Sequence, residues 1–424
     1  MKLMISTAAL AILATSAPAI AQYSPPPPPP PRIDTAVQQQ QKDAPAPAPQ
    51  KPGVKPSAKA LKALIDLQKA VDTNDTASIP AKVAAAQAVA STKEDHYLIG
   101  QMQLKAALAA KDNAATASAI DAIAASGYQS GPEIAELYMA LGSSLYNAKQ
   151  FDQAAAAFQK GSALDPSNSG LLLNLAEARF AQGQAADAVG IFQRAIQAKS
   201  AAGQKAEEAL YKRALSIAYT AKLPQAAELG RQWVAAYPSA DSWRNAIAVY
   251  RNQTQQDVQG TLDLLRLMQA TGAMTTPSDY ALFIQATADQ LNYNEAQAVL
   301  DAGIAAHVVD PSSAQFRQIA DVLKVKAKAT TADLEAAVKM SPNVQNLLRI
   351  GDRYYGMGNF SKAAEIYRQV MSRPGVDKDL ANLHLGMALA RSGDKAGATA
   401  ALNAVGGTRA EIAKYWLVYV QQHG

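Results

Sequence analysis

Residues 138–166 read YMALGSSLYNAKQFDQAAAAFQKGSALDP, and this stretch decides the fold. Its apolar residues recur at intervals of three and four, first up to Tyr146 and again from Phe151 onward, as they do on two amphipathic helices. Only residues 147–150 separate the two runs, so we expect the helices to lie antiparallel. Pro166 ends the second helix, because proline cannot donate the next backbone hydrogen bond.

The same pattern returns along the chain. The stretch holds a Leu-Gly pair at 141–142, a small residue at Ala154 and an aromatic residue at Phe158. At a shift of 34 residues these positions hold Leu175-Ala176, Ala188 and Phe192. Nearer the C-terminus the spacing recurs twice, as Ile350-Gly351, Ala363 and Tyr367, and then as Leu385-Gly386, Ala398 and Leu402. We expect the small residues to let paired helices cross closely, and the aromatic residues to fill the space between repeats.

This pattern strongly resembles the tetratricopeptide repeat, which has a Leu-Gly pair, a small residue, an aromatic residue four positions later and a closing proline. The resemblance implies an all-α fold, a right-handed superhelical solenoid of antiparallel helix pairs with about 21 helices. Good matches cover roughly 129–200 and 344–405, with weaker ones around 204–240 and 277–310.

We divide the chain into six segments by composition and by the strength of the repeat. They are a signal peptide (1–21), a disordered linker rich in Pro, Gln and Ala (22–56), N-terminal helical hairpins (57–128), a tetratricopeptide-repeat block (129–240), degenerate repeat-like hairpins (241–343), and a C-terminal repeat block with a capping helix (344–424). The run of seven prolines from Pro25 to Pro31 prefers an extended polyproline conformation. It is either a spacer or a docking motif.

The first residues predict export. Met1-Lys2 gives a positive start, residues 3–14 are apolar, and Ala19-Ile20-Ala21 is a small-x-small cleavage site. Polar residues and Pro18 make the same stretch a poor membrane anchor, and no later segment is apolar enough to span a membrane. We therefore expect a mature protein with no transmembrane segment, in the periplasm of a Gram-negative bacterium.

Composition and charge exclude several classes of function. The chain has no cysteine, which removes disulfides, thiol nucleophiles and Cys-based metal sites. Its net charge of +5 comes entirely from residues 1–62, which hold seven Lys or Arg and two Asp. The rest of the chain is electrically balanced and therefore lacks the net basic excess of a nucleic-acid binder. We expect no nucleic-acid partner.

No motif points to catalysis, a cofactor or a metal. The four histidines are not spaced as metal ligands, and a lone helical histidine is more often a surface or packing residue; they are His96, His307, His384 and His423. Carboxylate pairs fall at helix boundaries, where capping explains them. We found no serine in a nucleophile elbow. We therefore expect a protein that is not an enzyme.

In the family that the repeats resemble, ligands lie against the first helix of each pair. The resemblance implies a groove for a protein or peptide partner, lined by Tyr146, Asn174, Glu177, Tyr211 and Lys212 in the N-terminal block and by Arg349, Asp352 and Tyr355 in the C-terminal block. Some members grip a carboxylate with clustered Lys, Asn and Arg, but Met139 and Leu173 stand where a lysine would be needed.

The function predicted from these observations is a non-catalytic periplasmic scaffold or adaptor that binds other proteins, in an envelope assembly or secretion complex. The alternative is a helical superstructure within an enzyme system for cell-wall glycans or polysaccharide export. The sequence does not name the partner.

Overall fold

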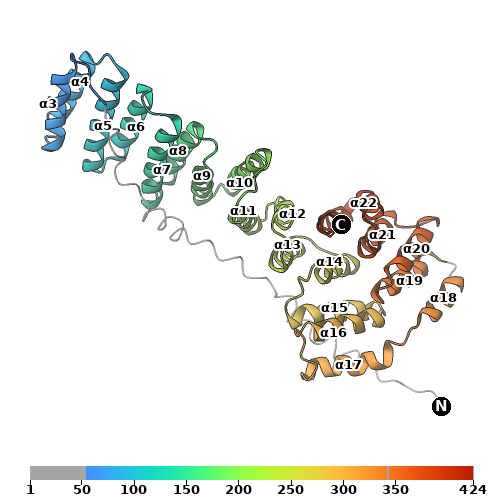
Figure 1. Cartoon of the computed structure of the whole chain (residues 1–424). Helices are drawn as coiled ribbons and strands as arrows, with labels where there is room; N and C mark the ends of the chain where they lie inside the picture. Colours follow the sequence, from blue (N-terminus) through green and yellow to red (C-terminus); the bar gives the residue numbers. More distant parts are fainter. Residues whose placement is uncertain (1–53, 341–342, 424) are drawn as a thin grey trace. The chain divides into compact units, whose positions relative to one another are not determined.

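The computed structural model describes residues 54–340 and 343–423, and within them it contains 21 α-helices and no strand (Figure 1). The helices are α3 (Leu61–Asp72), α4 (Ile79–Val89), α5 (Lys93–Ala110), α6 (Asn113–Ser126), α7 (Gly131–Asn147), α8 (Phe151–Leu164), α9 (Ser169–Ala181), α10 (Ala185–Ala201), α11 (Glu208–Thr220), α12 (Ala226–Ala236), α13 (Ala240–Gln253), α14 (Val258–Ala270), α15 (Pro277–Asp289), α16 (Tyr293–Ala305), α17 (Ala314–Lys326), α18 (Thr331–Met340), α19 (Val344–Gly356), α20 (Phe360–Met371), α21 (Lys378–Ser392), α22 (Lys395–Asn403) and α23 (Ala410–Gln422).

This arrangement confirms the all-α, repeat-based fold that the sequence predicts. Helix α11 begins at Glu208, after an irregular connection. There Gly203 takes a left-handed conformation, and residues 204–207 form a non-helical link. The predicted signal peptide and residues 22–53 of the predicted linker lie outside the described residues. None of the helices described is long and apolar enough to cross a membrane.

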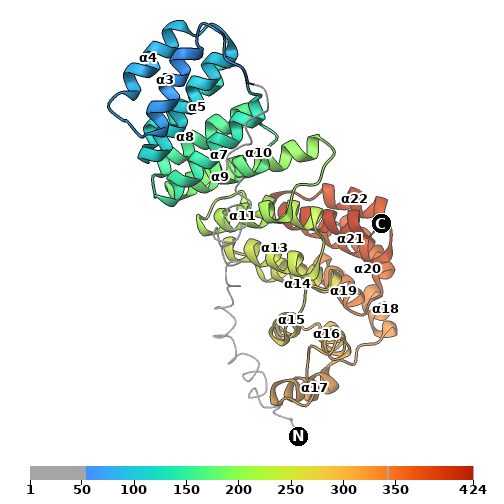
Figure 2. The same cartoon turned by 60° about the vertical axis from the view of Figure 1, so that its left-hand side comes forward.

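The helices form two compact units, one ending at Leu223 and the other beginning at Pro224. In the N-terminal unit, α3 to α11, each helix packs against the next along the chain, and the pairs follow one another as a stack (Figures 1 and 2). The C-terminal unit, α12 to α23, begins in the same way. Its helix α16, however, also packs directly on α19, so the chain leaves the stack at α17 and α18 and returns to it.

A close contact inside each pair explains the repeat. Gly142 on α7 lies against Phe158 on α8, and a Cβ atom on Gly142 would be only 2.5 Å from Phe158 Cε1. In the C-terminal unit Gly351 has the same relation to Tyr367, at 2.5 Å from Cε1. Ala154, the small residue of the second helix, is fully buried. The repeat therefore keeps small residues where the helices approach each other most closely.

The C-terminal unit is closed by its last helix. We predicted that this helix would cover the last repeat, and α23 does pack on α21 and α22. It also packs on α12, at the other end of the unit. Gln422 Nε2 donates to the Val234 carbonyl at 2.7 Å, and the Tyr415 hydroxyl donates to the Ala227 carbonyl at 3.1 Å. Helices nearly 190 residues apart in sequence thus become neighbours.

The contact between Gly142 and Phe158 makes a direct prediction. Gly142→Ala should destabilise the protein by about 1–3 kcal/mol, because the added methyl group forces a fully buried ring to move. The matched control is Gly190→Ala on α10, where an added Cβ meets nothing within 4 Å. That change should be neutral or stabilising by up to about 1 kcal/mol. Urea unfolding followed by circular dichroism measures both, and equal effects would mean that the repeat register is wrong.

Candidate functional site

In the N-terminal unit, the first helices of successive pairs carry a buried ion pair. Arg213 on α11 donates to Glu177 on α9 through both Nε and Nη2, at 2.5 and 2.6 Å. The two residues are only 9% and 7% exposed, and the guanidinium also lies 5.1 Å from the centre of the Phe180 ring. A bidentate ion pair fixes the orientation of the guanidinium relative to the carboxylate. It therefore aligns α9 with α11.

Tyr146 on α7 belongs to the same face. Its half-buried ring meets Phe151 edge-on at 5.2 Å. Burial raises the pKa of Tyr146, and the negative charge of Glu177 raises it further. The positive charge of Arg213 lowers this pKa but does not cancel the increase. These electrostatic effects show that Tyr146 lies near the ion pair, and they keep its hydroxyl protonated as a hydrogen-bond donor.

The other predicted residues of this block are placed differently. Asn174 on α9 is half-buried, and Tyr211 on α11 is buried. Lys212 is exposed and forms an ion pair with Glu208 on its own helix, at 3.0 Å. The structure thus brings Tyr146 and Glu177 close to Arg213. Protein binding by this face stays a prediction.

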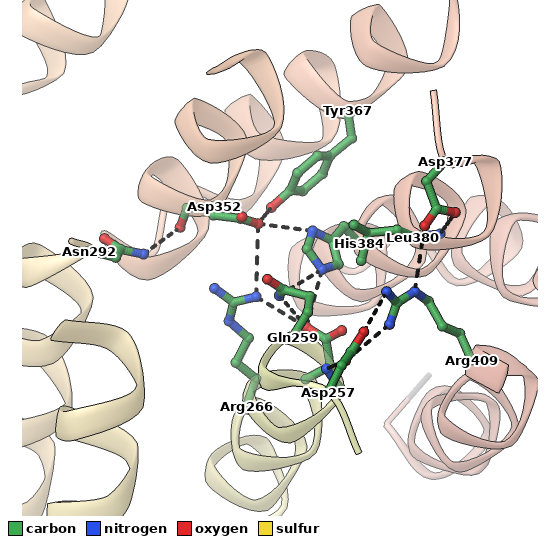
Figure 3. Close-up of polar contacts among 12 residues, drawn as sticks. Asp257, Gln259, Arg266, Asn292, Asp352, Tyr367, Asp377, Leu380, His384 and Arg409 are labelled. Carbon is green, nitrogen blue, oxygen red and sulfur yellow. Dashed lines mark hydrogen bonds and ion pairs between the residues drawn. The ribbon is translucent and has the colours of Figure 1, made fainter. Parts of the chain in front are cut away.

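A second cluster of charges lies inside the C-terminal unit (Figure 3). Arg266 on α14 is 2% exposed and donates to Glu295 on α16 through Nε and Nη2, at 2.8 and 2.9 Å. Its Nη1 lies 3.2 Å from Asp263 Oδ1 and 3.9 Å from Asp352 Oδ1 on α19. Burial alone would lower the pKa of Arg266, but the neighbouring carboxylates raise it above its usual value. The arginine therefore stays charged and joins three helices.

His384 on α21 completes this cluster. Its Nδ1 lies 2.9 Å from Asp352 Oδ1 and its Nε2 lies 3.2 Å from Asp263 Oδ1. Burial lowers the pKa of His384, but the two carboxylates outweigh burial and raise the pKa to about 9. The Tyr367 hydroxyl also donates to Asp352, at 2.8 Å. We call these residues, together with Arg266 and Glu295, the charge network.

The predicted groove residues of the C-terminal block divide between the interior and the surface. Asp352 belongs to the charge network, and its side chain is 15% exposed. Tyr355 is 5% exposed, with the Arg266 guanidinium 5.0 Å from its ring centre. Arg349 is exposed. Two of the three residues are therefore part of the packing inside the unit.

A cavity of about 480 Å³ lies beside the charge network. Asp257 and Asp377 line it and are held by Arg409, whose guanidinium lies 3.0 and 4.0 Å from their carboxylates. Arg349 and Arg353 on α19 also line it, and within residues 54–340 and 343–423 neither side chain has a hydrogen bond or an ion pair. The same part of the chain contains no cluster of three or more His, Asp or Glu suited to a metal ion.

Comparison with known proteins agrees with this architecture. A family model described as "Tetratricopeptide repeat" matches residues 101–169, 139–203 and 348–407. Residues 101–203 and 348–407 thus match tetratricopeptide repeats. Among solved structures, the pentatricopeptide repeat protein PPR10 from maize is similar over 98% of this chain and 66% of its own length, with 11% sequence identity and a TM-score of 0.25. The chain thus spans about two thirds of the length of that protein. A search of curated proteins found no match.

The sequence did not predict the residues that hold the two clusters together. Arg213 follows Glu177 by 36 residues, close to one repeat length, and opposite charges at that spacing are a usable signal. No comparable signal exists for Arg266 and His384. Apart from Asp263, which shares α14 with Arg266, the partners of Arg266 lie on other helices at irregular separations in the sequence, as do those of His384. His384 itself fitted the expectation of a packing residue.

The position of His384 predicts how stability depends on pH. Its pKa of about 9 in the folded protein exceeds the usual value of 6.5, so its contribution is complete below pH 6.5 and is lost as the pH rises through 9. The loss should not exceed about 3 kcal/mol. All three tryptophans lie in the C-terminal unit, so their fluorescence during urea unfolding reports this change.

His384→Gln should lower stability at pH 6.5 and flatten its decline between pH 6.5 and 9.5. His307→Gln, at an exposed turn of the same unit, should keep the wild-type dependence on pH. If His384→Gln declines with pH as steeply as the wild type, the imidazole is not charged in the folded protein.

Proposed function

We propose that this protein is a non-catalytic scaffold that binds a segment of another protein along α7, α9 and α11. The observation that carries the proposal is the match of tetratricopeptide repeats to residues 101–203, which include α7 and α9. Stacked repeats present the first helices of their pairs side by side, as an extended binding surface. The Glu177–Arg213 pair supports the proposal because it holds two of these helices in a fixed arrangement.

Three side chains are suited to make the contacts. Tyr146 offers a half-buried ring with a protonated hydroxyl, and the half-buried Asn174 has a side chain that makes no hydrogen bond with the described part of the chain. Lys212 supplies an exposed positive charge, shared with Glu208. Aromatic and charged residues of this kind contribute most of the energy of protein interfaces.

Replacement of Tyr146, Asn174 and Lys212 by alanine should remove partners that the wild-type protein recovers from a cell-envelope extract. Helix content should hardly change, because none of the three is fully buried. The readout is quantitative mass spectrometry of the captured proteins.

The matched control replaces Gln153, Arg194 and Gln197, which are exposed on the second helices α8 and α10. This variant should keep every partner. If the groove variant also keeps every partner, then the face formed by α7, α9 and α11 is not the binding surface.

We further propose that the protein works in the periplasm. The support is the N-terminal sequence, with its positive start, its apolar residues 3–14 and the small residues Ala19 and Ala21 before the predicted cleavage point. A scaffold in this compartment would bind other envelope proteins.

Export makes a simple prediction. The intact mass of the protein from its native host should correspond to a chain that begins at Gln22, and the protein should be released with the periplasmic fraction. A mass that includes Met1, found in the cytoplasmic or membrane fraction, would contradict export with cleavage.

A further inference from the structure

The turn before α16 holds a leucine in an unfavourable backbone conformation. Leu291 has a φ angle of +58°, in the left-handed region, and its side chain is 59% exposed. This conformation brings the β-carbon too close to the next carbonyl oxygen, so large apolar residues rarely adopt it. The matching turns of other helix pairs hold Gly183, Gly358 or Lys149. Leu291 therefore gains little from burial and strains its backbone, so folding alone does not explain a leucine there.

A second exposed apolar side chain lies at the same end of the C-terminal unit. Helices α16 and α17 pack against each other, and the end of α17 meets the start of α16 (Figure 1). Lys326 Nζ lies 5.7 Å from the centre of the Tyr293 ring, and Asn294 Nδ2 donates to the Ala329 carbonyl at 2.9 Å. Val325 is 65% exposed there. By the helical period it points away from the residues that α17 buries, which are Phe316, Ile319 and Leu323.

Three lysines flank Val325 in the sequence. Lys324, Lys326 and Lys328 are exposed, and none of them forms an ion pair within residues 54–340 and 343–423. Residues 322–332 contain no Asp, Glu or Arg, so this stretch carries a charge of +3. The negative end of the helix dipole accounts for lysines in the last turn of α17, but Lys328 lies beyond that turn. We call Leu291, Val325 and the three lysines the basic–apolar surface.

The chemistry of the basic–apolar surface fits a lipid bilayer with anionic headgroups. A lysine ammonium is a compact, strongly hydrated charge on a flexible stem, which suits a diffuse layer of negative charge. A single carboxylate or phosphate group is better matched by the planar fork of an arginine, which residues 322–332 lack. Exposed aliphatic side chains can enter the boundary between headgroups and acyl chains. Lysines and aliphatic residues together therefore favour a peripheral membrane contact.

We propose that the basic–apolar surface binds a membrane that contains anionic lipids. The three lysines lie against the headgroup phosphates, and Leu291 and Val325 enter the interface. Each lysine near such a surface increases the affinity about fivefold, so the three together contribute about 100-fold. This surface belongs to the C-terminal unit and does not rest on the proposed scaffold function of α7, α9 and α11.

The test is co-sedimentation of the whole chain from Gln22 onward with lipid vesicles. Vesicles of phosphatidylcholine and phosphatidylglycerol in equal parts should bind the protein, and vesicles of phosphatidylcholine alone should bind it at least about tenfold more weakly. Binding to the anionic vesicles should fall when the salt concentration is raised to about 0.5 M, because ions screen the attraction.

The variant Lys324→Gln/Lys326→Gln/Lys328→Gln should bind the anionic vesicles about 100-fold more weakly than the wild type. The matched control should bind like the wild type, because it removes the same charge from exposed positions of the same unit outside this surface. Its substitutions are Arg373→Gln, Lys378→Gln and Lys395→Gln.

The variant Leu291→Gly separates binding from folding. Its affinity for the anionic vesicles should fall about tenfold, because one inserted leucine is lost. Its melting temperature should rise by about 2–4 °C or stay unchanged, because glycine adopts the left-handed conformation without strain. A clear fall in melting temperature would show that the leucine serves packing and would overturn its place in the proposal.

Three further results would each overturn the proposal. They are the absence of binding to anionic vesicles, equal binding to the two kinds of vesicle, and unchanged binding by the triple lysine variant. The last result would assign vesicle binding to another basic stretch, such as residues 32–62. Circular dichroism of all variants separates lost binding from lost folding.

Discussion

The fold depends on one repeated contact, between a residue without a large side chain on the first helix of a pair and a bulky side chain on the second. Gly142 and Phe158 make this contact in the N-terminal unit, and Gly386 and Leu402 make it in the C-terminal unit, where an added Cβ would lie 2.5 Å from Leu402 Cγ. Because interiors are close-packed, a side chain larger than hydrogen at the glycine would push the helices apart. The contact therefore sets the spacing within each pair, and the pairs can then stack.

Packing within pairs does not by itself explain how helices of separate repeats are held together in the C-terminal unit. There Arg266 is buried with its charge, which is costly unless acceptors surround it. Asp263, Glu295 and Asp352 are those acceptors, and they come from three helices. The requirement to pair this charge joins helices of separate repeats across the inside of the unit. With α23 packed on α12, the unit closes on itself, and the cavity remains beside the paired charges.

Most of the helices could be predicted from the sequence because they depend on local periodicity. The repeat register could be predicted as well, since Gly142, Ala154 and Phe158 mark it at fixed spacing. The closure could not, because the contact of Gln422 with Val234 depends on how every intervening pair curves. Asp352 was expected in an open groove, but it is paired with His384. This pairing could not be predicted either, because it too depends on how the intervening pairs curve. At the candidate sites, the sequence prediction included Tyr146 and Glu177 but not Arg213, although Arg213 follows Glu177 by close to one repeat length.

The most direct test of this account measures whether α12 and α23 are neighbours in solution. The chain has no cysteine, so spin labels can be placed specifically at Glu228→Cys on α12 and Lys414→Cys on α23, both exposed positions. Electron–electron double resonance should give a single narrow distance distribution, of the kind expected for helices packed about 8–10 Å apart. A broad distribution, or one centred at a distance far beyond that of packed neighbours, would show that the C-terminal unit is open and would contradict the account.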